Sequence, residues 1–394
     1  MEKPTFMPRK ASIDAYRGFV MLLMMGEVLS FGKMAKAFPD SVFWQFLDYH
    51  QSHVEWVGCS LHDMIQPSFS FLVGVALPYS IASRIAKGES NRTMYMHAFR
   101  RSLVLILLGI FLRSMHAQQT YFTFEDTLTQ IGLGYFFLFL LGFRSVKTQI
   151  MALIVLLVGY FIAFALYPLP DINFDYNQAG VTPDWSYNLT GFAAHWNKNT
   201  NLSWAFDRWF LNLFPRVSPF LNNRGGYATL SFIPTLGTMI LGLLAGNELK
   251  SHSESNEKLN TLIIVGILLL VSGWGLSALN ICPNVKRIWT PSWTLYSGGA
   301  CFLFLSFFYW GIDVLKTPKW YFILTVVGTN SIAAYIIAHT IDGFIASSLS
   351  IHLGKQYAEV FGTAYAPFVS GVLILFFEWL ILLWLYRKRI FIKI

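Results

Sequence analysis

The sequence predicts an all-α protein, a polytopic bundle of about ten transmembrane helices that forms one domain over residues 1–394. Three observations lead to this prediction. First, 55% of the 394 residues are hydrophobic, only 13% are charged and the mean hydropathy is +0.49, which excludes an ordinary soluble domain. Second, the apolar residues come in blocks of about 20, and each block can cross a hydrocarbon layer of about 30 Å. Third, no small-residue cleavage site follows the first block, so this block is expected to remain as a span.

The predicted spans follow the apolar blocks in order. The first block begins beside Arg17, and the second has Pro67 early in the helix, where proline suits a loop-to-helix entry. The other spans are assigned from the lengths of their blocks. The ten predicted spans are Tyr16–Met34, Met64–Ile85, Phe99–Met115, Leu128–Phe143, Gln149–Tyr167, Tyr227–Leu249, Leu259–Leu279, Trp293–Leu315, Trp320–Ile341 and Tyr365–Tyr386.

The basic residues predict the orientation of the bundle. An even number of spans places both termini on one face, and the excess of Lys and Arg there predicts that this face is cytoplasmic. The net charge of +8 is therefore a topology signal, and nucleic acid is not an expected partner. We expect a multi-pass protein of a bacterial inner membrane, with the loop after the first span in the periplasm. Of the 29 basic residues, the 19 on the cytoplasmic face are Lys3, Arg9, Lys10, Arg17, Arg84, Lys87, Arg92, Arg100, Arg101, Arg144, Lys147, Lys250, Lys258, Lys316, Lys319, Arg387, Lys388, Arg389 and Lys393.

The longest polar segment, residues 168–226, is predicted to lie on the outer face. It is rich in Asn, Trp, Pro and Asp, as in "WSYNLTGFAAHWNKNTNLSWAFDRWF", and it is too long for a simple connector. Aromatic faces stack on sugar rings, and Asn and Asp side chains bind hydroxyl groups. We therefore expect this extracytoplasmic loop to cap a site, with an interfacial aromatic belt as the alternative for any single Trp.

Titratable side chains gather in the loop after the first span, within "SHVEWVGCSLHD" (residues 52–63). His53 can both accept and donate a proton near neutral pH, and a carboxylate such as Asp63 can fix its tautomer and raise its basicity. The alternatives are that Asp63 caps the helix that follows and that His53 is an inert loop residue. His62 is expected to be an interfacial loop residue.

Polar residues inside the predicted spans are the next indication of function, because an unsatisfied amide or charge in hydrocarbon costs about 2–4 kcal/mol unless it has a partner or a role. A hydrogen bond between helices is the alternative for each residue taken alone. Several of them fall near the outer ends of different helices, so we expect a shared cavity. Amide groups can polarise a carbonyl there, as oxyanion-hole donors do. The residues are Glu27, Gln130, Asn330, His339 and Glu378.

Two segments, "ASIDAYRGFVMLLMMGE" (residues 11–27) and "HVEWVGCSLHDMIQPSFSFLVGVALPYS" (residues 53–80), resemble signatures of the heparan-α-glucosaminide N-acetyltransferase family and its bacterial membrane relatives. The second segment fits the pattern H-x-x-W-x-G-x-x-x-x-D-x-x-x-P-x-F-x-F-x-x-G with intact spacing from His53 to Gly74. Further matches follow in family order across nearly the whole chain: "RRSLVLILLGIF", "LTQIGLGYFF", "GLLAGNEL", "SWTLYSGGACFLFL" and "GTNSIAAYIIAH".

This resemblance implies a membrane-embedded acyltransferase that takes acetyl from cytosolic acetyl-CoA and delivers it to the amine of a terminal glucosamine across the membrane. In that family the histidine that matches His53 is the active-site residue on the non-cytoplasmic side. It either carries the acetyl group covalently or acts as a base, and both roles need an unprotonated imidazole. The predicted catalytic residues are His53 and Asp63. The predicted substrate-binding residues are Glu27, Trp56, Gln130, Asn330 and His339.

The sequence departs from the family pattern at two places. The family enzyme has an Asn near the outer end of the first span, where this chain has Glu27 or Val28, as some bacterial relatives have an acidic residue. The Asp-Pro-Glu-Gly segment often found before the sixth span is replaced by "NNRGGYAT" (residues 222–229). If those acids bind an amino sugar, the acceptor of this protein differs.

Acetyl-CoA is the expected co-substrate, and its phosphates favour arginine as a partner. Arg17, Arg100 and Arg101, at cytoplasmic ends of spans, are the predicted residues for it, with plain positive-inside topology as the alternative. No metal is expected, because the three cysteines lack metal-binding spacing. The other expected partners are an amino sugar or glycan end, the lipid bilayer and a second copy of the chain in a homodimer.

The alternative function is an inner-membrane permease for an amino sugar or its N-acetyl form. A cavity lined by amides and aromatic rings suits such a permease as well. Many secondary transporters contain an internal repeat, and this sequence has no convincing one, so acyl transfer is preferred.

Overall fold

The computed structural model describes residues 10–171, 173–317 and 320–392. Within these residues every regular element is a helix, which confirms the predicted all-α class. The β-type pairing in these ranges is limited to an isolated antiparallel bridge between Val57 and Val285. That bridge joins two loops that meet at the candidate site.

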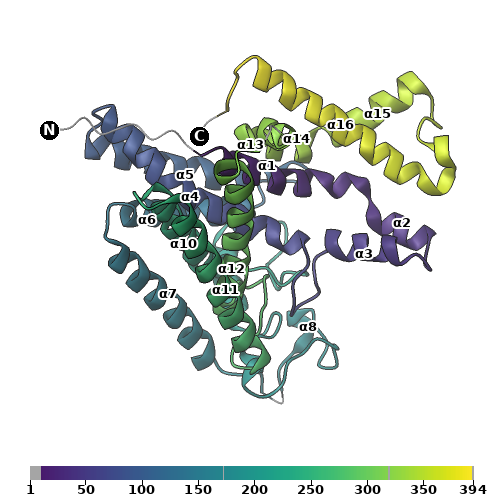
Figure 1. Cartoon of the computed structure of the whole chain (residues 1–394). Helices are drawn as coiled ribbons and strands as arrows, with labels where there is room; N and C mark the ends of the chain where they lie inside the picture. The colour runs from purple at the N-terminus through teal and green to yellow at the C-terminus, as the bar shows by residue number, and fades with distance from the viewer. Residues whose placement is uncertain (1–9, 172, 318–319, 393–394) are drawn as a thin grey trace.

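Among the described residues, seven helices, some with a short extra turn at one end, are long and apolar enough to cross a membrane. Figure 1 shows most of them packed side by side, with the shorter loop helices at one end. The seven are α4 (Ile65–Ala86), α5 (Asn91–Ser114), α7 (Val146–Leu166), α10 (Phe232–Lys250), α11 (Ser255–Ala278), α12 (Pro291–Phe308) and α16 (Ala366–Arg387).

The first predicted span is broken rather than continuous. Helix α1 (Ala11–Met25) continues through a 3-10 turn (Gly26–Leu29), and the chain then bends by 43° into α2 (Phe31–Ala37). Gln51 stabilises the break, because its side chain donates to the carbonyl of Gly26 at 2.6 Å and accepts from the N–H of Phe31 at 2.9 Å. These are backbone groups that an unbroken helix would pair internally.

Two further predicted spans also differ from a single long helix. Helices α13 (Phe322–Thr329) and α14 (Ser331–Thr340) meet at 83°. Helix α6 (Thr127–Leu141) has only 15 residues, fewer than the about 20 that a bilayer needs. Each of the ten predicted blocks thus contains a helix. Seven of the described helices qualify as spans, or up to nine if each bent pair counts as one, and ten crossings stays a prediction.

The close helix crossing between α4 and α10 depends on glycine. A Cβ atom on Gly74 would lie 2.0 Å from the carbonyl oxygen of Met239, and one on Gly242 would lie 1.9 Å from that of Phe71. Small residues let helix backbones approach in this way where lipid supplies no hydrophobic drive. The crossing fixes the direction in which α4 presents its first turns to the candidate site.

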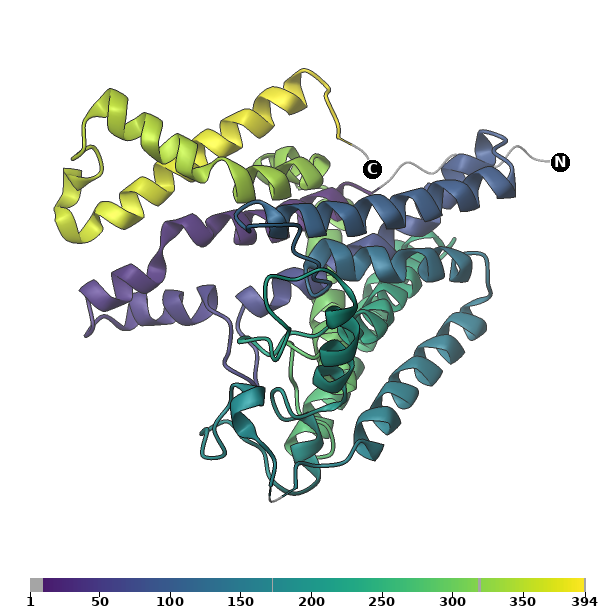
Figure 2. The ribbon, with the colours of Figure 1, turned by 180° about the vertical axis from the view of Figure 1, so that it is seen from behind.

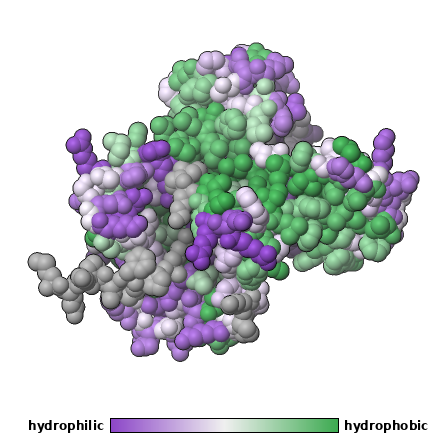
Figure 3. All heavy atoms as spheres, turned by 90° about the horizontal axis from the view of Figure 1, so that it is seen from above, coloured by the Kyte–Doolittle hydropathy of each residue, from purple (hydrophilic) through white to green (hydrophobic). Residues whose placement is uncertain are grey.

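Four elements extend to one side of the bundle, as Figures 1 and 2 show: α2, α3 (Val42–Gln51), α15 (Asp342–Leu353) and the first half of α16. Several of their large apolar side chains are exposed, among them Phe43 and Phe344. In Figure 3 hydrophobic residues form a broad band across one face, with hydrophilic residues towards its margins. An exposed apolar band of this kind is the surface that a bilayer covers.

The described parts of the two chain ends lie on the same side of the bundle. The carbonyl of Asp14 in α1 lies against Gly328 in α13, and the side chain of Asn330 pairs with backbone groups of Ile390 and Ile392 near the C-terminus. This arrangement is the one that an even number of crossings gives. Of the basic residues used to predict orientation, Lys3, Arg9, Lys319 and Lys393 lie outside the described residues.

The segment 168–226 folds into short helices, α8 (Tyr176–Ala179), a 3-10 helix (Gly191–Trp196) and α9 (Leu202–Phe210). Amide side chains hold its turns; that of Asn199 donates to the carbonyls of Ala179 and Asn223 at 2.9 and 2.8 Å. Trp196 packs in an aromatic cluster that also contains Trp56. The segment is therefore bound to the loop that carries His53.

Candidate functional site

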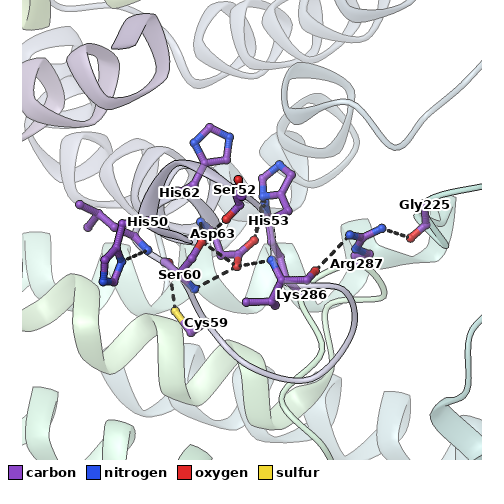
Figure 4. Close-up of polar contacts among 12 residues, drawn as sticks. His50, Ser52, His53, Cys59, Ser60, His62, Asp63, Gly225, Lys286 and Arg287 are labelled. Carbon is purple, nitrogen blue, oxygen red and sulfur yellow. Dashed lines mark hydrogen bonds and ion pairs between the residues drawn. The ribbon is translucent and has the colours of Figure 1, made fainter. Parts of the chain in front are cut away.

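Three side chains meet where the loop after α3 passes the loop before α12. Nδ1 of His53 lies 2.8 Å from Oδ1 of Asp63, and Nζ of Lys286 lies 3.1 Å from the same nitrogen and 3.4 Å from the same oxygen. Figure 4 shows the three converging. We call them the His53–Asp63–Lys286 triad.

The local sequence places Asp63 with several donors. It lies in a single 3-10 turn (His62–Met64) that leads directly into α4. Its Oδ2 accepts from the backbone N–H of Ser60 at 3.0 Å, from the hydroxyl of Ser60 at 3.1 Å and from the N–H of Val54 at 3.3 Å. The carboxylate is 1% exposed, so these bonds replace the water that it loses. Asp63 thus closes the 53–63 loop as well as contacting the histidine.

Arg287 connects the triad to the segment that precedes α10. Its guanidinium donates to the carbonyl of Gly225 at 2.7 Å and to the carbonyl of Val54 at 3.0 Å. The N–H of Gly58, which has φ +132°, donates to the carbonyl of Asn284 at 3.1 Å. Three loops far apart in sequence are held together at this point, so His53 sits on a fixed backbone.

The contacts of His53 determine which ring nitrogen is available. Nδ1 contacts Asp63 and Lys286, whereas no residue that the structure describes has a hydrogen bond to Nε2, and the side chain is 36% exposed. Burial lowers the pKa of His53 below its ordinary value. The hydrogen bond that the ring donates to Asp63 opposes this lowering, and the positive charge of Lys286 strengthens it. An unprotonated Nε2 near neutral pH can act as a nucleophile or as a base.

His53 faces a cavity of about 340 Å³, which we call the histidine cavity. Every wall comes from the end of a helix or from the loop beside it, and under the predicted alternation of spans all of these ends lie on the outer face. The lining residues are Met21, Met24, Glu27, His53, His62, Ile65, Gln66, Phe69, Arg113, Glu125, Asp126, Thr127, Asn223, Gly225, Tyr227, Lys286, Tyr335 and His339.

Charged groups of both signs line the histidine cavity. Nε2 of His62 lies 3.3 Å from a carboxylate oxygen of Glu27, and the guanidinium of Arg113 lies 3.3 Å from Asp126. The Tyr335 hydroxyl donates to Asp126 at 3.2 Å. Burial raises the pKa of Glu125 above its ordinary value. A cavity with this lining can bind a polar, charged molecule.

Three of the five predicted substrate-binding residues do not line the histidine cavity. Trp56 is fully buried and donates from its indole to the carbonyl of Trp196 at 3.1 Å. Gln130 is 1% exposed and donates to the carbonyl of Phe124 at 2.6 Å. Asn330 is fully buried and bonded to the C-terminal segment. The structure thus gives each a partner within the protein, and for Gln130 and Asn330 this is the alternative stated for a polar residue in a span.

The other two, Glu27 and His339, line the histidine cavity with His53. The ring of His339 stacks on Tyr335 with centroids 4.3 Å apart, and its Nδ1 lies 2.8 Å from the carbonyl of Tyr335. His62 also lines the histidine cavity. It is 9% exposed, and its ring centroid lies 4.5 Å from that of His53. The expectation that His62 is an interfacial loop residue is therefore wrong, because the turn at its position points its ring inward.

Arg100 and Arg101 line a second cavity of about 360 Å³, together with Arg84 and His97. We call it the arginine cavity. It is bounded by the last turns of α4, the first half of α5 and the second half of α6. The guanidinium of Arg101 donates to the hydroxyl of Tyr135 at 3.2 Å. Arg17 does not line this cavity and lies 3.6 Å from Asp14 on its own helix.

Sequence reasoning missed Lys286, Arg113 and Asp126. One signal for Lys286 was available, because the segment "NVKR" (residues 284–287) places two cations in a short loop on the face that should be poor in basic residues. An exception to that rule indicates a cation with a local partner. The partner itself, Asp63, is too far away in the sequence for any pattern to reveal it.

The sequence matches the model of one protein family, described as a domain of unknown function (DUF5009), over residues 9–207, which is just over half of the chain. The chain belongs to the DUF5009 family. The matched part contains His53, Asp63 and the three arginines of the arginine cavity, whereas Lys286 and His339 of this DUF5009 protein lie beyond it.

This DUF5009 protein is also similar to human heparan-alpha-glucosaminide N-acetyltransferase. The two are 22% identical over 436 aligned positions, which cover 98% of this chain and 60% of the human protein. This similarity confirms the resemblance identified from the sequence motifs. The chain spans less than two thirds of the length of that relative.

Proposed function

We propose that this protein is a membrane acyltransferase that moves acetyl from acetyl-CoA, bound on the cytoplasmic side, to the amine of a glucosamine-type sugar on the outer side. The observation that carries the proposal is the pair of cavities at opposite ends of α5 and α6, one lined by arginines and the other by His53. The similarity to a membrane N-acetyltransferase supports the same reaction class.

The separation of the two cavities suits an extended donor. Arg101 and Arg113 lie on the same helix, and their separation of 12 positions corresponds to about 18 Å along its axis. The phosphates of the donor are bound by Arg84, Arg100 and Arg101, since guanidinium groups form bidentate bonds with phosphate. The pantetheine arm then runs between the helices towards His53, and the long, thin part of the donor spans the distance.

The chemistry takes place at Nε2 of His53. In one route this nitrogen attacks the thioester carbon, the C–S bond breaks, and the acetyl group then passes from the ring to the amine. In the other route the amine attacks directly, and Nε2 takes the proton that the amine loses. In both routes the CoA thiolate leaves and is protonated, and Asp63 holds Nδ1 so that Nε2 is the reacting nitrogen.

The acidic lining of the histidine cavity supports an amine as the acceptor. A protonated amino sugar is a cation, and Glu27, Glu125 and Asp126 supply three carboxyl groups from two different segments. The acidic pair that is absent from residues 222–229 is thereby replaced at the same cavity by acids from other elements. Asn223 and Gly225 of the loop 168–226 also line it, which supports the role of that loop as a cap over the acceptor.

The test of the function is direct transfer of label. The full chain, purified in detergent, is incubated with acetyl-CoA carrying a radiolabelled acetyl group and with glucosamine, N-acetylglucosamine or glucose. We expect label to appear on glucosamine and not on the two sugars that lack a free amine. Labelling of none of them over a panel of amino sugars, with a folded protein, contradicts acyl transfer and favours the permease.

We expect the Arg101→Ala variant to bind acetyl-CoA about tenfold more weakly, because a charge-assisted hydrogen bond contributes about 1.5–3 kcal/mol. Acetyl-CoA should raise the Tm of the unchanged protein, since it binds the native state, and Arg101→Ala should need more ligand for the same rise. Arg144→Ala, which removes an exposed arginine outside the cavity, is the matched control. Equal shifts in all three proteins would exclude this cavity as the donor site.

The orientation is tested by labelling in intact cells. In a Cys59→Ser background, a membrane-impermeant thiol reagent should modify Ser52→Cys, beside the histidine cavity, and should leave Ser253→Cys unmodified, because the latter lies in a loop predicted to be cytoplasmic. Both serines are exposed. After the cells are lysed, both variants should react. The reverse pattern in intact cells contradicts the topology and places His53 on the wrong side for the proposed reaction.

A further inference from the structure

Lys286 is a buried cation whose ammonium group contacts two side chains. Its side chain is 5% exposed, and it lies in the loop between α11 and α12, 233 positions after His53. Its ammonium group contacts Nδ1 of His53 at 3.1 Å and Oδ1 of Asp63 at 3.4 Å. A lysine this buried needs a counter-ion, and Asp63 supplies it.

The two contacts of Nδ1 cannot both be hydrogen bonds in one protonation state. If Nδ1 carries the proton, it donates to Asp63, and the ammonium of Lys286 beside it has no lone pair to bind there. The shorter distance, 2.8 Å, is the one to Asp63, so the ring donates to the carboxylate. The ammonium then interacts with the same carboxylate oxygen and adds a positive charge next to the ring.

We propose that Lys286 is a positioning residue that keeps the ring of His53 neutral, with its proton on Nδ1 and its lone pair on Nε2, by balancing the charge of Asp63. Asp63 alone would fix the tautomer but would also attract a second proton to the ring, since a carboxylate this close favours the imidazolium. An ammonium group about 3 Å away opposes that second proton, because like charges disfavour each other.

Other charged and titratable groups also face His53, and they set the background against which Lys286 acts. His62 packs on the ring, and the Tyr227 ring centroid lies 6.4 Å away. Arg287 lies beside Lys286 and binds the backbone of Val54. Across the cavity are Glu27, Glu125, Arg113 and His339. Among the described residues, only Asp63 and Lys286 have a charged atom within 3.5 Å of Nδ1 of His53.

A purely structural role for Lys286 makes a different prediction. If the lysine only neutralises Asp63 to stabilise the loops, its removal lowers the Tm and leaves the titration of His53 where it was. If it acts on the ring, removal of its charge moves that titration upward. The two roles are therefore separated by measuring the protonation of His53 itself.

The experiment follows reaction of His53 with diethyl pyrocarbonate, which modifies unprotonated imidazole. The full chain in detergent is treated between pH 5 and 9, and the peptide that contains His53 is quantified by mass spectrometry. We expect Lys286→Met to raise the pH midpoint of modification by about one unit or more, the usual effect of a close charge. Lys286→Arg, which keeps the charge, should leave the midpoint near that of the unchanged protein.

Two further variants complete the test. Asp63→Asn should lower the midpoint, and Asp63→Asn with Lys286→Met should raise it again relative to Asp63→Asn alone, which measures the lysine even if Lys286→Met by itself does not fold. Lys33→Met removes an exposed lysine of α2 and should change nothing. An unchanged midpoint in folded Lys286→Met, or an equal rise in Lys286→Met and Lys286→Arg, overturns the proposal.

The effect of Lys286 on catalysis rests on the proposed function. Failure of that function can be distinguished from failure of the role inferred for Lys286. If acetyl transfer is detected, Lys286→Met should lose activity at neutral pH and regain it at higher pH, following the shifted midpoint. If no transfer occurs with any acceptor, the proposed function fails while the titration of His53 still decides the role of Lys286.

Discussion

The His53→Ala variant is expected to transfer acetyl at least about 10²-fold more slowly than the unchanged protein, which is the usual size of a general acid–base contribution. The loss should be larger if the ring itself carries the acetyl group. Because Asp63 keeps its bonds from Ser60 and Val54 and its ion pair with Lys286, removal of the His53 ring leaves no unpaired buried charge, and the Tm should change little. Rate and Tm are measured on the same preparation with radiolabelled acetyl-CoA and glucosamine.

Two further histidine variants make this result specific. His116→Ala removes an exposed histidine beyond the end of α5 and should keep the full rate. His62→Ala should fall between the two, because His62 lines the cavity and contacts Glu27 but is not the proposed reacting group. A well-folded His53→Ala protein with an undiminished rate would exclude His53 as the reacting group.

The Asp63→Ala variant is expected to lose about 3–5 kcal/mol of stability, the usual result of removing one partner from a buried ion pair. The change leaves the ammonium of Lys286 buried without a counter-ion and leaves the N–H groups of Ser60 and Val54 without their acceptor. Tryptophan fluorescence on heating should show a large fall in Tm. Acetyl transfer should fall as well, because the ring of His53 loses the group that orients it.

The double variant Asp63→Ala with Lys286→Met separates loss of the pair from the isolated charge. Removing both charges should recover much of the stability that Asp63→Ala loses, since residues in contact are not additive. If the double variant is instead less stable than Asp63→Ala, Lys286 is stabilised by something other than Asp63. That outcome would also weaken the role inferred for the lysine.

The helical fold could be predicted because hydrocarbon imposes length and composition on every span, and both are visible in the sequence. The breaks in α1 and between α13 and α14 could not. Each involves a contact with a distant part of the chain: Gln51 pairs with the backbone at the first break, and Asn330, which lies at the second break, is bonded to the C-terminal segment. A hydropathy pattern contains no information about such partners.

The candidate site was predictable to the extent that it is local. His53 and Asp63 lie 10 positions apart in one loop, and their chemistry and spacing predict a pair. Gln130 and Asn330 show the limit of this reasoning, because a polar residue in a span has either a ligand or a protein partner, and both carry the same sequence signature. Lys286 lies beyond that limit for a different reason, since its partner is more than 200 positions away.

The residues that line the histidine cavity extend along the chain from Met21 to His339, so most of the chain is needed to form it. Residues 9–207, which match the family model, supply His53 and Asp63 but not Lys286, Tyr227 or His339, so this part alone cannot form the cavity. The histidine cavity is therefore complete only after α14 has docked, and a molecule that occupies it reports on assembly of the chain as far as α14. A screen for molecules that bind this cavity is therefore also a screen for ligands that stabilise the folded protein.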